Sequence, residues 1–344
     1  VVWEALLDVG GRMRTERHGA RDSLSLTDSG AQYVTRLPMS SQLHDDVYAQ
    51  LHAAQLLKPL VGTVEGKRAA DGGGDNLVCE RGLGTLVAYL LESAGVEAIC
   101  GRRACAIHVV KSSDGGRPRW RVEHEHGADV FDAVVLTQPV PQQLRLLSGC
   151  GPGAWLAESE MYAKLRAVEY SARYAMSLFF SERHRQELDA LVPYVAKYVS
   201  REEDNRLVFV SYDSAKRQTR GAPSLLVHSS VPFGLARMRA KVPTATVEAE
   251  LLESLWRVLP GLPQPLSVLV HPWEYSQVRY PLEMDNGATS FLLQPALTQG
   301  AVPPLVLCGD AFSPLGSRFD GCIQSGDHAA TTVIEALHAS GQLV

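Results

Sequence analysis

The sequence predicts a mixed α/β fold, in which one α/β domain is interrupted by a domain built on an antiparallel sheet. Strand and helix patterns alternate over residues 1–137 and again from residue 304 to the end of the chain. The stretch between them is rich in β-forming residues separated by turn residues. With 344 residues, 45% of them hydrophobic and 21% charged, the chain is large and apolar enough to bury a sizeable core.

In the first α/β portion, residues 1–4 predict a strand and residues 8–12 a turn. Apolar residues at helical spacing predict helices over residues 42–57 and 84–93, and Gly95 ends the second of these. The other elements predicted here are a polar hairpin with a loop over 62–76, and strands over 96–100, 120–123 and 130–137.

In the middle of the chain, strands are predicted over 168–181, 191–199, 206–212, 223–231 and 266–270. A helix over residues 246–258 ends at Pro260 and Gly261. The last portion again alternates strand and helix, with a strand predicted over 304–308 and a helix over 321–339. This order fits a chain that leaves a dinucleotide-binding domain, builds a substrate domain and returns. The predicted boundaries are 1–38, 77–155 and 298–344 for the first domain, and 39–76 and 156–297 for the second.

Composition and charge narrow the range of possible partners and sites. A net charge of −5 gives no support to a nucleic-acid partner or a membrane-surface partner. No run reaches the roughly 18 apolar residues that a membrane helix needs. The six cysteines are scattered, mostly in apolar runs, which favours reduced, buried thiols over a disulfide framework. His124 and His126 have no third ligand in view, so we predict no metal site.

Glu4 closes the first predicted strand and is followed by Gly10, Gly11 and Arg12. In a dinucleotide-binding βαβ unit, an acidic residue at the end of the second strand accepts the ribose hydroxyls, about 20 residues after a Gly-x-Gly-x-x-Gly turn. Only three residues precede Glu4, so that turn would fall before residue 1. The glycines would let backbone approach a pyrophosphate, and Arg12 would neutralise its charge. A plain turn with a surface arginine is the alternative.

Two further segments are suited to lie against a flat ligand. Asp28–Tyr33 combines small residues with a turn, which permits close backbone contact with a ring. Thr137 and Pro139 follow the apolar run Ala133–Leu136, as is common where a ligand crosses the C-terminal ends of strands. A loop-to-strand junction and an ordinary strand end are the alternatives.

The most specific signal lies near the end of the chain, where a buried strand reaches Gly309-Asp310 and a Gly-rich helix start follows at Asp320-Gly321. Asp310 could accept a ribityl hydroxyl or orient a pyrophosphate. The helix N-terminus offers N–H groups and the positive end of a dipole, which would stabilise negative charge on a reduced flavin. The alternative is a solvent loop at Asp310 and a helix capped by Asp320.

Taken in order, these segments resemble the FAD-binding segments of the flavin amine-oxidase superfamily, and longer strings resemble the renalase family within it. The similarity extends nearly end to end. The strings are Gly11–Met13, Gly30–Tyr33, Ser171–Ala175, Val231–Gly234, Leu259–Pro265, Ser276–Val278 and Phe319–Ile323.

The resemblance implies an FAD-dependent oxidase that converts 2- and 6-dihydro isomers of NAD(P)H to NAD(P)⁺ and reduces O₂ to H₂O₂. No strong acid or base is needed, because the cofactor carries the chemistry. The residues implied to hold non-covalent FAD are Glu4, Gly10, Gly11, Arg12, Gln32, Tyr33, Ala104, Thr137, Gly309, Asp310, Asp320, Gly321, Cys322 and Ile323. The candidates for the substrate pocket are Arg173, Tyr174, His228, Phe233, Trp273, Tyr275 and Gln277.

The sequence departs from the family pattern at its beginning, where the first strand, the Gly-rich turn and the first helix are absent. We therefore expect this chain alone to bind FAD poorly or not at all, and to expose unpaired sheet edges. A flavin-free binding protein on the same scaffold and an amine or polyamine oxidase are the alternative functions. A cytoplasmic location is expected, with secretion as the alternative, and the sequence predicts no oligomeric state.

Overall fold

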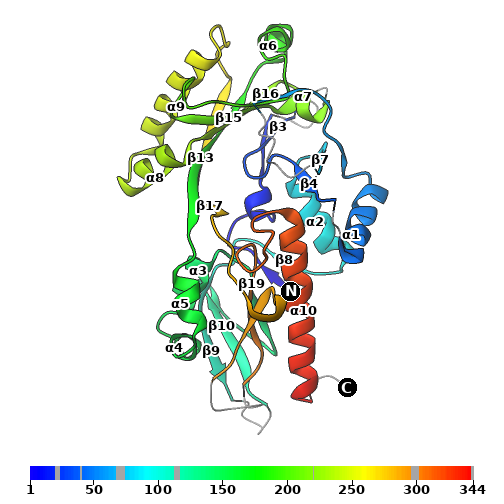
Figure 1. Cartoon of the computed structure of the whole chain (residues 1–344), viewed down its shortest axis with the longest axis vertical. Coiled ribbons are helices and arrows are strands. Elements are labelled where there is room, and N and C mark those ends of the chain that lie inside the picture. The colour runs from blue at the N-terminus through cyan, green and yellow to red at the C-terminus, as the bar shows by residue number, and fades with distance from the viewer. Residues whose placement is uncertain are drawn as a thin grey trace. The chain divides into compact units, whose positions relative to one another are not determined.

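The computed structural model describes residues 1–19, 24–38, 41–66, 74–111, 117–219, 221–295 and 302–341 (Figure 1). The chain packs into two compact units. Unit 1 comprises Val1–Asp8, Ala98–Tyr170 and Gln277–Val344, and unit 2 comprises Val9–Glu97 and Ser171–Ser276. These units divide the chain differently from the functional domains predicted above, whose boundaries stay a prediction.

Two of the parallel strand pairs lie in unit 1. β1 (Val2–Trp3) pairs in parallel with β8 (Ala98–Ile99), and β12 (Val134–Leu136) pairs in parallel with β19 (Leu305–Cys308). On its other side β19 pairs antiparallel with β18 (Ser290–Leu293). A second sheet follows the order β11-β10-β9. Its strands are β9 (Ala104–Val110), β10 (Arg119–His124) and β11 (Gly127–Phe131), and the helices of the unit are α3 (Val140–Leu147), α4 (Gly151–Ala157), α5 (Met161–Arg166) and α10 (Phe319–Ala339).

The predicted single strand over 130–137 is wrong, because the structure divides this stretch between two sheets. β11 folds back on β10 through the turn before Gly127, whose φ of +150° suits glycine. The chain then breaks pairing at Asp132 and Ala133, and the apolar β12 joins β19. A hairpin partner for β10 and a parallel partner for β19 are both needed, and one continuous strand cannot serve both.

Two edges of the parallel strands carry no strand partner among the described residues. There, β1 is paired only with β8, and β12 only with β19. Apolar side chains on or beside these strands reach solvent, with Leu7 88% exposed and Val135 41% exposed. Both strands therefore lie at sheet edges within the described part of the chain.

The core of unit 1 lies between its sheets and helices α3 to α5. Trp120 is its largest fully buried side chain, and its indole N–H points at the carbonyl oxygens of Pro303 (3.1 Å) and Pro304 (2.9 Å). This bond ties β10 to the segment that leads into β19, since a buried indole N–H needs an acceptor.

Unit 2 is built on a six-stranded sheet of order β17-β13-β16-β15-β14-β6. The strands are β17 (Ser267–Val278), β13 (Tyr170–Phe179), β16 (Ser224–Ser229), β15 (Leu207–Tyr212), β14 (Ala196–Tyr198) and β6 (Val64–Glu65). The helices that follow its strands are α6 (Arg185–Leu191), α7 (Asp213–Arg217), α8 (Val231–Arg239) and α9 (Thr244–Val258). Val247, Leu251 and Leu255 on one face of α9 are fully buried in the core against this sheet.

Smaller elements complete unit 2. The strands β2 (Thr15–His18) and β3 (Ser25–Asp28) form an antiparallel pair, and a three-stranded sheet has the order β4-β7-β5. Its strands are β4 (Val34–Arg36), β7 (Asp75–Val78) and β5 (Lys58–Pro59), and the helices nearby are α1 (Gln42–Ala53) and α2 (Gly84–Ser93). The predicted hairpin over 62–76 is wrong in its described part, because β6 pairs with β14 while β7 pairs with β4 and β5. Residues 67–73 lie outside the described residues.

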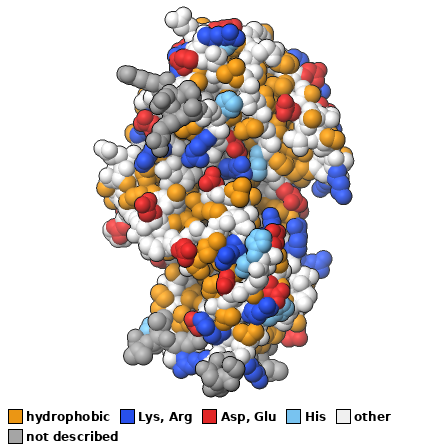
Figure 2. All heavy atoms as spheres, turned by 180° about the vertical axis from the view of Figure 1, so that it is seen from behind, with side chains coloured by type: hydrophobic (Ala, Val, Ile, Leu, Met, Phe, Trp, Pro, Cys, Tyr) orange, Lys and Arg blue, Asp and Glu red, His pale blue; other side chains and the backbone are white. Residues whose placement is uncertain are grey.

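The surface carries mixed charge. On the face shown in Figure 2, acidic and basic side chains are interspersed among hydrophobic ones, as a net charge of −5 allows. A search of the helices in the described ranges finds none with the length and apolar character that crossing a bilayer requires.

The prediction that the cysteines are mostly buried is wrong. All six are free thiols, yet among them only Cys79 and Cys308 are buried, while Cys100, Cys105 and Cys322 are exposed. Cys105 lies on the outward face of β9, whose side chains alternate, and an apolar run of sequence does not show which face is buried.

Candidate functional site

In unit 2, the two segments predicted separately to approach a cofactor lie against each other. The amide of Ala31 donates to the carbonyl oxygen of Arg12 at 2.9 Å. A Cβ placed on Gly30 would lie 1.9 Å from that same oxygen, so only glycine permits the approach. We call Asp28–Tyr33 the β3 segment, because it begins at the last residue of β3.

The Gly10-Gly11 pair forms the other half of this contact. It leads into the single 3-10 turn Gly11–Met13, and the two residues have φ of +123° and +50°. A Cβ on Gly10 would meet the Cα of Gly84 at 3.5 Å, whereas a Cβ on Gly11 would meet no described atom within 4 Å. Gly11 therefore presents backbone to open space, as close approach of a ligand requires.

Two of the predicted pocket residues bind the β3 segment with their polar atoms. Trp273 Nε1 donates to the carbonyl oxygen of Ser29 at 2.8 Å, and His228 Nε2 lies 3.2 Å from the same oxygen. Because that partner can only accept, Nε2 of His228 carries the proton. Burial first, and then the charge of Arg173, lower the pKa of His228 to about 3. His228 is thus a neutral hydrogen-bond donor at physiological pH.

His228 should make the folding stability of the protein rise with pH between about 3 and 6.5. The unfolded chain takes up a proton at His228 near pH 6.5 and the folded chain does so only near 3. The stabilisation is fully present above pH 6.5 and declines as the pH falls, by up to about 1.4 kcal/mol per pH unit. We expect His228→Gln, which keeps a donor but does not titrate, to flatten this slope. Urea unfolding of both proteins from pH 4.5 to 7.5 measures it, and parallel curves would contradict the assignment.

The other predicted pocket residues fall into different environments. Tyr174 and Phe233 are buried in the core of unit 2, with ring centroids 6.5 Å apart in an edge-on arrangement. Burial lowers the pKa of the Arg173 guanidinium. The hydroxyl of Tyr275 donates to Glu274 at 3.0 Å on an exposed part of β17, and Gln277 belongs to unit 1. The structure thus gathers His228 and Trp273 at the β3 segment, and assigns Tyr174 and Phe233 to the core.

A buried cluster of four charges, which the sequence analysis missed, holds the start of the β3 segment. Its members are Asp28, Asp213, Lys216 and Arg217, each almost fully buried. Arg217 Nη1 lies 2.7 Å from Asp28 Oδ2 and 3.1 Å from Asp213 Oδ2, and Lys216 Nζ lies 2.8 Å from Asp213 Oδ1. The i,i+3 and i,i+4 spacing of Asp213 to Lys216 and Arg217 was a readable helical ion-pair signal. The contact of Asp213 with Asp28, which lies 185 residues earlier in the chain, could not be read from the sequence.

In unit 1, Thr137 and Gly309 meet where β12 and β19 end. Gly309 has φ of +125°, and a Cβ on it would lie 3.1 Å from the carbonyl oxygen of Thr137. The amide of Gly309 donates to Ser325 Oγ of α10 at 2.9 Å. The two predicted strand-end residues therefore lie together at the carboxyl edge of parallel strands, where α/β proteins bind ligands.

Asp310 is buried directly after this turn. Its carboxylate accepts hydrogen bonds from the Tyr170 hydroxyl, at 3.0 Å, and from the Ser317 hydroxyl. These bonds orient the carboxylate, and neither donor was singled out from the sequence.

The start of α10 differs from the prediction. The helix begins at Phe319, two residues before the predicted start at Gly321, and Asp320 lies inside its first turn, so the alternative of a helix capped by Asp320 is not what the structure has. Among the described residues no side chain caps the helix at Arg318. A Cβ on Gly321 would lie 2.6 Å from the carbonyl oxygen of Gly316, so this side of the helix end packs against the preceding loop, while Cys322 is exposed.

Gln143 on α3 links the two strand ends and was missed by the sequence analysis. Its Nε2 lies 2.7 Å from the carbonyl oxygen of Gln138, 2.9 Å from that of Cys308 and 3.2 Å from that of Leu136. Three converging carbonyl oxygens require a donor, which fixes the orientation of the amide. Gln143 thus holds the residues that flank Thr137 to the residue that precedes Gly309.

We expect the two nearly isosteric variants of Gln143 to differ. Gln143→Glu places a carboxylate oxygen against three carbonyl oxygens and should lower the free energy of unfolding by about 3 kcal/mol or more. Gln143→Met removes the donor without adding repulsion and should cost about 1–3 kcal/mol. Urea denaturation of both variants tests the order, and equal losses would argue against the bonding pattern.

Glu4 and Ala104 lie at other strand ends of unit 1. Glu4 follows β1, and its Oε1 accepts from the amide of Leu6 at 2.7 Å. The backbone of Glu4 is bonded to Ile99 at 3.0 Å and to Arg102 at 2.8 Å, which carries β1 alongside β8. Ala104 begins β9 opposite His124. The acidic side chain is thus at the end of a parallel strand, as a ribose contact requires.

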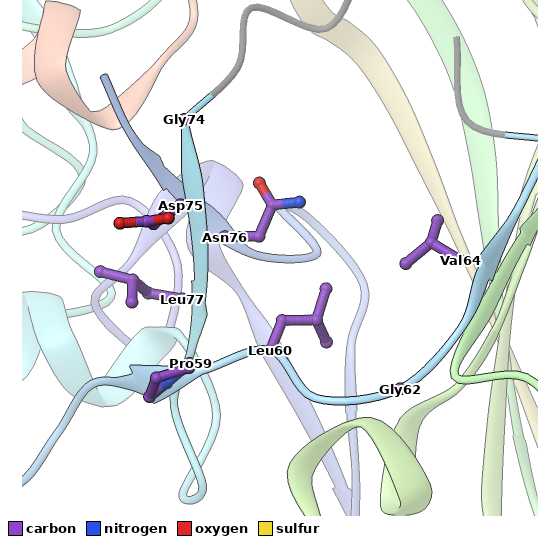
Figure 3. Close-up of a pocket in the computed structure, with 8 residues that line it drawn as sticks. All are labelled: Pro59, Leu60, Gly62, Val64, Gly74, Asp75, Asn76 and Leu77. Atoms are coloured by element: carbon purple, nitrogen blue, oxygen red, sulfur yellow. The ribbon is translucent and has the colours of Figure 1, made fainter. Parts of the chain in front are cut away.

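A surface hollow of about 580 Å³ lies elsewhere in unit 2 (Figure 3). Its lining residues are Pro59, Leu60, Gly62, Val64, Gly74, Asp75, Asn76 and Leu77. None of the residues predicted for cofactor or substrate is among them. We therefore assign the hollow no part in the chemistry.

An α/β unit whose parallel strands end at Thr137 and Gly309, in a chain that also builds an antiparallel-sheet unit, has the architecture of a flavin-dependent oxidoreductase. The sequence profile of the flavin-containing amine oxidoreductases matches residues 49–334. The chain therefore belongs to this family. It is 32% identical to renalase of Mus musculus over 330 residues, covering 94% of this chain and 87% of that protein.

A solved structure shares the fold. A chain from Exiguobacterium sp. 255-15, described as a protoporphyrinogen oxidase, superposes with a TM-score of 0.53 at 17% sequence identity. The match covers 76% of this chain, which spans about half (52%) of the other. At this identity the match establishes the fold alone.

Proposed function

We propose that this chain is an FAD-dependent oxidase of the renalase type, which oxidises 2- and 6-dihydro isomers of NAD(P)H to NAD(P)⁺ while O₂ is reduced to H₂O₂. The balance is one substrate, one O₂ and one proton in, and one NAD(P)⁺ and one H₂O₂ out. The main support is the state of the polar residues at the β3 segment: His228 is neutral and, like Trp273, donates to backbone. Such a site suits hydride transfer without a protein acid or base.

Particular residues fit a flavin. Gly11 offers backbone to open space, and Gly309 and Gly30 lie where a side chain would collide with backbone. When bound, the flavin supplies the hydride acceptor and the route of two electrons to O₂. We propose that Glu4 accepts ribose hydroxyls, that Arg12 neutralises pyrophosphate, and that Asp310 accepts a hydroxyl of the ribityl chain.

The remaining proposed contacts are made by backbone. The β3 segment would lie against the ring, since Gly30 and Ala31 have little or no side chain. The first turn of α10, Phe319–Cys322, would direct its dipole at the pyrimidine end. The substrate would then be placed by Trp273 and by the half-buried Tyr275 of β17, and water would be excluded by stacking of the rings.

The test compares two proteins: the chain as it stands, and the same chain with a strand, a Gly-x-Gly-x-x-Gly turn and a helix joined ahead of Val1. We expect the first to quench FAD fluorescence weakly, and the second to bind FAD and oxidise 6-dihydro-NAD with stoichiometric H₂O₂. An extended protein that binds FAD, oxidises amines and leaves dihydro-NAD untouched would overturn the proposal. Full FAD occupancy in the chain as it stands would refute our expectation of weak binding.

A further inference from the structure

The short helix α7 places two cations where no water reaches them. Lys216 and Arg217 are 1% and 0% exposed, and they share the site with Asp213 of the same helix. Such an arrangement is costly, because each charge has lost its hydration. Buried ion pairs contribute little net stability over an apolar core, so the reason for keeping this one lies in what it positions.

Both cations hold the β3 segment, one at each end. Arg217 binds the carboxylate of Asp28 through Nη1, at 2.7 Å, and donates through Nη2 to the carbonyl oxygen of Leu26. Lys216 donates to Oε1 of Gln32 at 3.2 Å. The helix also binds the backbone, since the amide of Asp28 donates to Asp213 Oδ2 at 2.7 Å.

The contact of Lys216 with Gln32 fixes the shape of the turn. With Oε1 of Gln32 taken by the ammonium group, its Nε2 faces the segment, where it donates to the carbonyl oxygens of Asp28 and, at 3.0 Å, of Gly30. Reversal of the amide would set its oxygen against both of those carbonyl oxygens and its NH2 group against the ammonium group of Lys216. Lys216 therefore determines which way the Gln32 amide closes the turn.

We propose that Lys216 and Arg217 are positioning residues for the flavin, which hold the β3 segment in the conformation that meets the ring. This rests on the proposed function, and it adds residues of the antiparallel-sheet unit that touch no cofactor. The affinity for FAD and the rigidity of the β3 segment then depend on α7.

The test uses Lys216→Met, which keeps the length of the side chain without its charge, and Gln32→Met, which removes the receiving amide from a half-buried position. Lys197→Met is the matched control, because it removes a cation from an ion pair with Glu203 in the same sheet unit. FAD affinity is measured by fluorescence quenching with each variant made in the protein extended ahead of Val1 that tests the proposed function, and amide hydrogen exchange is followed in peptides covering 28–33 and 224–229.

We expect Lys216→Met and Gln32→Met each to weaken FAD binding by about tenfold or more, and the double variant to lose no more than the worse single one. Exchange should accelerate at 28–33 and stay unchanged at 224–229 and in Lys197→Met. Unchanged exchange at 28–33 in both variants overturns the inference, whatever the affinity. If the extended protein without a substitution shows no quenching, the proposed cofactor is wrong, and the exchange data still decide the positioning role.

Discussion

Gly30→Ala is expected to destabilise unit 2 by about 3 kcal/mol or more and to displace the β3 segment. The added Cβ would lie 1.9 Å from the carbonyl oxygen of Arg12 and 2.6 Å from its carbonyl carbon. Both are backbone atoms, so no side chain can move aside. Relief requires separating the two segments and losing the bond from Ala31 to Arg12.

The matched control is Gly326→Ala in α10, where the new Cβ would meet no described atom within 4 Å. It should raise the free energy of unfolding by about 0.5–1 kcal/mol, because alanine loses less backbone entropy in a helix. Urea denaturation compares the two variants. Equal stability of Gly30→Ala and the unsubstituted protein would show that the segments do not approach as described.

Asp213→Asn is expected to cost about 3–5 kcal/mol, the range for breaking one partner of a buried ion cluster. Burial by itself would raise the pKa of Asp213, but Lys216 and Arg217 outweigh it, and the pKa lies below its usual range. The carboxylate is therefore charged in the folded protein, and its stabilisation is present above about pH 4 and lost below it as the folded group takes up a proton. In the variant, two buried cations face only Asp28.

Two controls separate charge imbalance from lost packing. Asp132→Asn breaks an exposed pair with Arg119 and should change stability by no more than about 0.5 kcal/mol. The double variant Asp213→Asn with Lys216→Met leaves one cation facing one carboxylate, and it should be more stable than Asp213→Asn alone. A double variant that is further destabilised would show that charge balance is not the cause.

Much of the fold was readable from local pattern. Helices over 84–93 and 246–258 were predicted from apolar residues at helical spacing, and α2 and α9 match them within two residues. The strand into Gly309 was predicted from its continuous apolar run. The prediction failed at 130–137 and 62–76, where the partner of a strand is decided by residues far along the chain.

The candidate site, like the fold, could be predicted only in part. Glycines at 10, 11, 30 and 309 were singled out because a missing side chain is visible in sequence, and each has unusual φ or a contact that a side chain would obstruct. Tyr174 and Phe233 were taken for pocket residues, and their rings lie in the core, because an aromatic residue in a strand gives no sign of which face it lies on.

The sequence by itself determined the class of fold, the strand-end glycines and the family resemblance, because these depend on residue type and on spacing along the chain. Only the tertiary structure showed that Arg217 meets Asp28 across 189 residues, that Gln143 joins two strand ends, and that His228 binds the carbonyl oxygen of Ser29. Such contacts are long-range and leave no periodic trace. The charge or amide that makes them looks, in sequence, like any other polar residue until the fold brings its partner within hydrogen-bonding distance.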